Sequence, residues 1–119
     1  MSMSQLRVST DGGVVIATVA GEIDMSNAAE LAGAIRTRIS NHNLGLVLDL
    51  QAVAYLDSAA IHAIFELREQ LHHRGQELRL VLPDPGAALA LTLAGVPDVI
   101  PVAVTPEAAR DEIAGGAGR

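Results

Sequence analysis

The sequence predicts a single α/β domain built on a mixed, mostly parallel sheet of about five strands with about four helices. Three observations predict this class. Short β-branched runs alternate with longer segments of helical periodicity, glycine, proline or asparagine separates most of them, and 119 residues fit one domain. Half of the residues are hydrophobic, which argues against disorder. We therefore expect one domain over residues 1–119, in which residues 114–119 form a flexible tail.

A hairpin is expected to open the domain. The run Val14–Val19 is rich in β-branched residues and too short for a helix, and Leu6–Ser9 is a shorter run of strand character. The residues between them, Asp11-Gly12-Gly13, are typical of a tight turn. We therefore expect the first strand to lie antiparallel to the second.

The next segment changes to helical periodicity. Apolar residues recur at helical spacing over residues 28–39, so we expect a helix that ends near Asn41. Its N-cap is Ser26 or Asn27. If Asn27 is the cap, Glu30 is placed to complete a capping box.

A buried strand, a second helix and another strand come next. The run Leu46–Leu50 predicts a buried strand, and the strand–helix–strand unit that it closes predicts a right-handed crossover with parallel strands. The second helix is expected to begin at Asp57 or Ser58 and to end at Gly75, and Glu77–Leu82 predicts the following strand. The residues expected on the buried face of this helix are Ala60, Ile61, Ile64, Phe65, Leu67 and Leu71.

The last third of the chain predicts two more helices and a short strand. Gly86–Leu93 is an apolar helical segment, and Val99–Val102 predicts a strand. The final helix is expected to start at Thr105, with Pro106 at its first position and Glu107 near the positive end of its dipole.

The composition argues against several functional classes. The chain has 14 acidic and 8 basic side chains, a net charge of −6, and only Tyr55 and Phe65 as aromatics, which opposes nucleic-acid binding. The absence of cysteine excludes disulfides, cysteine-ligated zinc and thiol catalysis. The apolar stretch Gly86–Val96 is shorter than the roughly 18 residues that span a bilayer, so we expect a cytoplasmic protein without membrane insertion.

Polar side chains occur where two of the predicted parallel strands end. Asp24 follows the second strand, and Asp57 and Ser58 precede the second helix. Because parallel strands end at one edge of a sheet, we expect these three residues to be neighbours. Two interpretations stay open: Asp57 or Ser58 is only an N-cap, or Ser58 accepts a phosphoryl group that the free N–H groups of the helix start can hold. Such a phosphate adds about −1.5 to −2 charge beside two carboxylates.

Nearly the whole chain resembles the STAS domain family, in particular the bacterial anti-sigma factor antagonists. The order and length of the elements agree with that family, and so does an Asp-Ser pair followed by a small residue. The segments that carry the resemblance are Gly21-Glu22-Ile23-Asp24, Val47-Leu48-Asp49-Leu50 and Tyr55-Leu56-Asp57-Ser58-Ala59-Ala60-Ile61. The sequence departs from the family at Ala60, where glycine is usual, and we expect the extra methyl group to alter the contact with a partner.

The resemblance implies a regulatory binding protein that is not an enzyme and needs no cofactor. It implies that Ser58 is phosphorylated by an anti-sigma factor that is a serine kinase, and that a phosphatase reverses the reaction. Before phosphorylation the protein would occupy the anti-sigma factor and release the sigma factor. The partner-binding residues expected from the resemblance are Glu22, Asp24, Asp57, Ala59, Ala60 and His62.

Other functions were weighed against this one. Ser58 and His62 are one helical turn apart, as a nucleophile and a base could be, but the glycines of a nucleophile elbow are missing. The adjacent His72 and His73 point in different directions on a helix, so no metal site is expected. The alternative function is a structural or regulatory subunit of a signalling assembly or of a lipid-transport ATPase complex.

Overall fold

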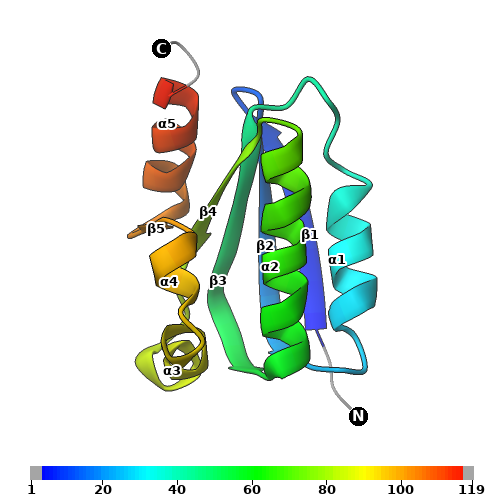
Figure 1. The fold of residues 1–119 in the computed structure, drawn as a ribbon, viewed down its shortest axis with the longest axis vertical. Helices are drawn as coiled ribbons and strands as arrows, with labels where there is room; N and C mark the ends of the chain where they lie inside the picture. Colours follow the sequence, from blue (N-terminus) through cyan, green and yellow to red (C-terminus); the bar gives the residue numbers. More distant parts are fainter. Residues whose placement is uncertain (1–3, 117–119) are drawn as a thin grey trace.

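Five strands form one mixed sheet in the order β1-β2-β3-β4-β5, in a computed structural model that describes residues 4–116 (Figure 1). The strands are β1 (Ser4–Asp11), β2 (Val14–Ile23), β3 (Gly45–Leu56), β4 (Glu77–Val81) and β5 (Val102–Ala103). The helices are α1 (Ala28–Arg36), α2 (Ser58–His73), α3 (Pro85–Leu93), α4 (Val96–Val99) and α5 (Pro106–Gly116). Strand β1 pairs antiparallel with β2, and the remaining neighbours are parallel. The predicted fold class, hairpin and parallel crossover are therefore confirmed.

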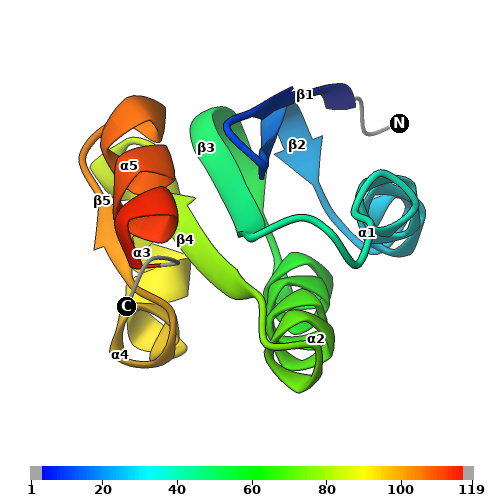
Figure 2. The same ribbon diagram turned by 90° about the horizontal axis from the view of Figure 1, so that it is seen from above.

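The sheet separates two apolar layers because successive residues of a strand face opposite sides. In β3, Leu46, Leu48 and Leu50 belong to the larger core under α1 and α2, which also includes residues of α3 and α4. Val47 belongs to a smaller cluster on the other face, where α5 contributes Ala109 and Ile113. Figure 2 shows α1 and α2 side by side along one face and α5 on the opposite side of the sheet.

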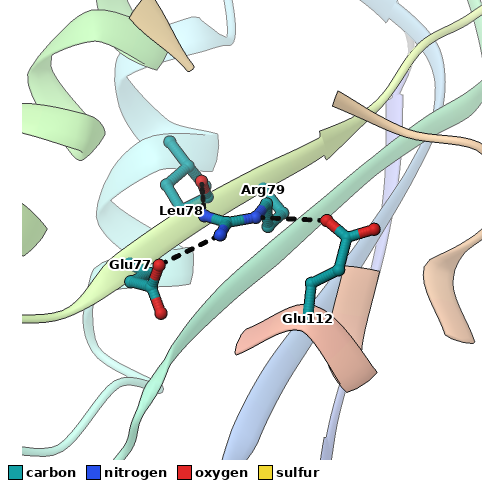
Figure 3. Close-up of polar contacts among 4 residues, drawn as sticks. All are labelled: Glu77, Leu78, Arg79 and Glu112. Atoms are coloured by element: carbon teal, nitrogen blue, oxygen red, sulfur yellow. Dashed lines mark hydrogen bonds and ion pairs between the residues drawn. The ribbon is translucent and has the colours of Figure 1, made fainter. Parts of the chain in front are cut away.

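Helix α5 is fixed to the sheet by two arginines. The guanidinium of Arg79 on β4 is mostly buried and lies 3.3 Å from Glu112 of α5 and 3.0 Å from Glu77 (Figure 3). Arg110 of α5 contacts Asp11 at the end of β1. Its hydrogen bonds with Asp11 and then Asp111 raise the pKa of Arg110, which favours the charged guanidinium.

Close approach of two strands explains one glycine. A Cβ atom on Gly45 would lie 2.2 Å from the backbone oxygen of Glu77, so no other residue can start β3 beside β4 without moving the backbone. Gly75 has φ of +71° directly after α2, and it ends the helix as predicted.

The first predicted helix begins as expected, and it differs from the observed one in where it ends and in the bonding of its N-cap. Helix α1 ends at Arg36 and not near Asn41. Asn27 is the N-cap residue, but the capping box is not formed. Its side-chain oxygen accepts from the Asp24 N–H at 3.0 Å, and its amide donates to the Glu22 carbonyl at 2.9 Å, because the sharp turn after β2 leaves those groups without strand partners.

The other differences lie in the strands and in the last third of the chain. Strand β3 continues past Leu50 to Leu56 because, despite two irregularities in register, it stays paired with the end of β2. The strand predicted at Val99–Val102 is instead the short helix α4 followed by β5 at Val102. Where a tail was expected from Ala114, helix α5 continues to Gly116, and residues 117–119 lie outside the described part of the chain.

Candidate functional site

The site is built at the edge of the sheet where β2 and β3 end together. Ile23 is the register partner of Leu56, and the Asp57 N–H donates to the Ile23 carbonyl at 3.2 Å. The loop after β2 and the start of α2 are therefore held side by side. This confirms that the parallel strands bring two segments far apart in sequence to one edge.

Asp57 joins these two segments with its carboxylate. Its Oδ1 accepts from the N–H groups of Ala59 at 2.9 Å and Ala60 at 3.2 Å, so Asp57 is the N-cap of α2. Its Oδ2 accepts from the N–H of Met25, at 3.2 Å, in the loop after β2. The N-cap interpretation is thus correct for Asp57, which leaves Ser58 without that role.

Ser58 is the first residue of α2, and its side chain is exposed. Within residues 4–116, its hydroxyl makes no hydrogen bond to another group. Two of the N–H groups that were expected to hold a phosphate, those of Ala59 and Ala60, already donate to Asp57. The expectation that free N–H groups at the helix start hold a phosphate on Ser58 is therefore wrong for these two donors, because Asp57 already accepts from them.

Asp24 begins the loop that faces the start of α2. Its carboxylate accepts from the backbone N–H and the hydroxyl of Ser26, at 2.9 Å and 2.6 Å, and its carbonyl accepts from the N–H of Ala28. Glu22 is exposed at the end of β2. Glu22, Asp24 and Asp57 thus place three carboxylates on the segments that meet where β2 ends and α2 begins, so this edge is acidic before any modification.

The structure does not place every expected contact residue at the surface. Ala60 is 0% exposed and lies among the core residues between α1 and α2. The expectation that Ala60 contacts a partner is therefore wrong, because its methyl group lies in the interior, whereas its neighbour Ala59 is partly exposed.

His62 is exposed on α2, one turn after Ser58. Its Nε2 contacts the carboxylate of Glu66, one turn further along the helix. No hydrogen bond joins His62 to Ser58 within the described residues, so these two side chains do not form the nucleophile and base pair considered from the sequence.

Two exposed apolar residues beside the site were missed by sequence reasoning. Met25 is 84% exposed next to the Asp57 carboxylate, and Tyr55 is 51% exposed at the end of β3. Met25 lines a groove of about 240 Å³ between α1 and α2, together with Ala59 and His62. The sequence signal for Met25 is an apolar residue placed between a strand and a helix, outside the periodicity of both.

Residues 4–116 contain neither a metal-binding group nor a membrane-spanning helix. No group of three or more histidine, aspartate or glutamate side chains there is arranged to hold a metal ion. None of the helices within residues 4–116 combines the length and the apolar character needed to cross a membrane.

Comparison with known proteins identifies the family. The STAS domain model matches residues 5–109. The chain belongs to the STAS domain family. Among STAS relatives, BtrV of Bordetella bronchiseptica, a proposed anti-sigma factor antagonist, is 28% identical over 97 residues, which cover 82% of this chain and 84% of BtrV. RsfB of Mycobacterium tuberculosis, an anti-sigma-F factor antagonist, is 33% identical over 64 residues, 54% of this chain and 52% of RsfB.

Solved structures agree with this STAS assignment. An anti-sigma factor antagonist from Mycobacterium paratuberculosis superposes with a TM-score of 0.83 and 27% identity, covering 93% of this chain and 94% of that one. The unphosphorylated form of the antagonist SpoIIAA shares the fold, with a TM-score of 0.79 and 18% identity over 93% of this chain and 97% of that one. The named relatives of this STAS domain are thus regulatory antagonists.

Proposed function

We propose that this STAS domain is an anti-sigma factor antagonist that binds an anti-sigma factor through the surface around Ser58, and that phosphorylation of Ser58 abolishes this binding. The observation that carries the proposal is the Ser58 hydroxyl, which is exposed and has no hydrogen-bond partner in residues 4–116. A kinase can reach this oxygen without breaking any hydrogen bond of the fold.

The electrostatics around Ser58 explain how a phosphate would act. Because Asp57 already occupies the N–H groups of Ala59 and Ala60, a phosphate of about −1.5 to −2 charge is directed outward, beside carboxylates that repel it. A partner surface that fits the neutral hydroxyl then meets an unpaired charge. Such a mismatch costs several kcal/mol, and each 1.4 kcal/mol weakens binding about tenfold.

Three neighbouring side chains complete the proposed partner surface. Met25 offers an exposed apolar contact in the loop after β2, Glu22 is exposed at the end of β2, and His62 presents its imidazole from the first turns of α2. Exposed apolar side chains among polar ones are typical of an interface centre with its rim.

The proposal is tested with an anti-sigma factor kinase encoded in the same genome, ATP and this STAS domain. We expect a mass increase of about 80 Da on Ser58, since one phosphoryl group adds that mass. Ser58→Ala should bind the anti-sigma factor without being labelled. Ser58→Asp should bind about tenfold or more weakly, because one charge is added at the interface.

Ser9→Asp is the matched control, because Ser9 is exposed on β1, away from α2, and receives the same added charge. It should bind as the unchanged protein does. Phosphate found at another residue, or Ser58→Asp binding with unchanged affinity, would contradict the proposed switch.

A further inference from the structure

A second surface lies at the far end of α2 from Ser58. A cleft of about 370 Å³ opens between the C-terminal ends of α1 and α2, the ends drawn uppermost in Figure 1. The lining residues that follow Ser58 on α2, from Leu67 to Arg74, lie about 14 to 24 Å from it along the helix axis. The residues that line it are Arg36, Ile39, Leu67, Gln70, Leu71, His73 and Arg74.

The floor and the rim of this cleft differ in chemistry. Ile39, Leu67 and Leu71 are buried and form an apolar floor. Arg36 and Arg74 are exposed at the rim, and no carboxylate is among the lining residues. The cleft therefore combines a recessed apolar surface with two positive charges in a chain whose net charge is −6.

The arginines without ion pairs are concentrated at this end of the domain. In residues 4–116, the guanidinium groups of Arg68, Arg79 and Arg110 lie within 4 Å of a carboxylate. Those of Arg36, Arg38 and Arg74 do not, and Arg7 on β1 is the other arginine of residues 4–116 without an ion pair, although the chain has nearly twice as many acidic as basic side chains. Within residues 4–116, the guanidinium of Arg74 donates only to the neutral side chain of Asn41.

Local structure accounts for part of this pattern. Positive side chains at a helix C-terminus interact favourably with the helix dipole, and Arg36 and Arg74 lie at such ends. His73 lies 3.6 Å from the carboxylate of Glu69, so it adds no unmatched positive charge to the rim of the cleft. The dipole does not account for the apolar floor between the two arginines.

We propose that this cleft binds an acidic peptide segment of a partner protein, beside the groove lined by Met25 and His62, with which it shares Arg36. An apolar side chain of the segment would lie on the floor formed by Ile39, Leu67 and Leu71, and flanking carboxylates would contact Arg36 and Arg74. The net charge and the absence of aromatic side chains in the cleft disfavour nucleic acid. The floor is recessed, so it does not present the protruding apolar side chains with which a peripheral protein enters a bilayer.

The test uses the whole chain and a fluorescein-labelled peptide in which glutamates flank a pair of leucines. We expect saturable binding by fluorescence anisotropy, with amide chemical-shift changes at residues 36–39 and 67–74. The glutamine counterpart of the peptide should bind about fivefold more weakly, since it lacks the carboxylates that contact the two arginines. Arg36→Gln/Arg74→Gln should bind about fivefold more weakly, because two charge contacts at the exposed rim are removed.

Two controls separate docking from a structural role. Arg36→Gln alone should also weaken binding, and the Arg36 side chain makes no hydrogen bond in the described part of the chain, so its loss leaves the Arg74–Asn41 contact intact. Arg7→Gln removes an arginine on β1 that also has no ion pair within residues 4–116, and it should bind normally. Unchanged binding by the double variant, equal binding of the glutamine peptide, or binding only to single-stranded DNA or phosphatidylserine vesicles would overturn the proposal.

Discussion

The division of roles between Asp57 and Ser58 is open to a direct stability test. Asp57→Ala removes the cap on Ala59 and Ala60 and also the bond to the Met25 N–H. An N-cap contributes about 1 kcal/mol, and the exposed bond to the loop adds about 0.5–1 kcal/mol. We therefore expect the free energy of unfolding to fall by about 1.5–2 kcal/mol, which lowers Tm by about 6–8 °C in a chain of this length.

Two further variants separate these contributions. Asparagine is as good an N-cap as aspartate, so Asp57→Asn should keep the cap and lose only the loop bond, a change of about 0.5 kcal/mol. Ser58→Ala should change the free energy of unfolding by less than about 0.5 kcal/mol, since no hydrogen bond is lost and alanine is a good helix former.

Urea unfolding followed by circular dichroism measures all three differences, with equal m-values as the check that the transition stays two-state. The expected order of stability is Ser58→Ala, then Asp57→Asn, then Asp57→Ala as the least stable. If Ser58→Ala were as unstable as Asp57→Ala, the serine would be part of the cap, and its hydroxyl would contribute to the stability of the fold.

Further predictions concern the sheet and α5. Gly45→Ala should destabilise the domain by about 3 kcal/mol because the added Cβ meets the Glu77 carbonyl. Gly86→Ala should be neutral or slightly stabilising because nothing lies near its Cβ. Thermal unfolding compares the two variants, and equal Tm values would show that β3 and β4 do not require glycine at position 45. Arg79→Gln should lower the free energy of unfolding by about 1–2 kcal/mol because it breaks the contacts from the sheet to α5. Glu112→Gln should lower it by less, because Glu77 still pairs with Arg79. Amide exchange in α5 should be faster in the Arg79 variant, and unchanged exchange would show that apolar packing alone holds the helix.

Several parts of the fold were predictable because local signals agreed with the tertiary structure. The turn at Gly12, the apolar run Leu46–Leu50 and the C′ glycine Gly75 each have a physical preference that does not depend on distant residues. The end of β3 was not predictable in this way. Beyond Leu50 its side chains alternate poorly, and the strand persists because β2 continues beside it.

The candidate site was also predictable only in part. The sequence indicated a polar helix start at Asp57 and Ser58 and its place near Asp24, since parallel strands end at one edge. It did not distinguish which of the two residues caps the helix, because both types are good N-caps. It also did not reveal that the methyl group of Ala60 points into the core or that Met25 stands exposed.

The sequence by itself determined the class of fold, the order of the elements as far as α3 and the segment that contains Ser58, because periodicity, turn residues and helix-start chemistry are local properties. Only the tertiary structure decided which carboxylate holds both segments at that edge, and which arginines are left without ion pairs at the opposite end. These outcomes depend on distances between residues that are far apart in the chain, such as Met25 and Asp57, and local preference carries no information about such distances.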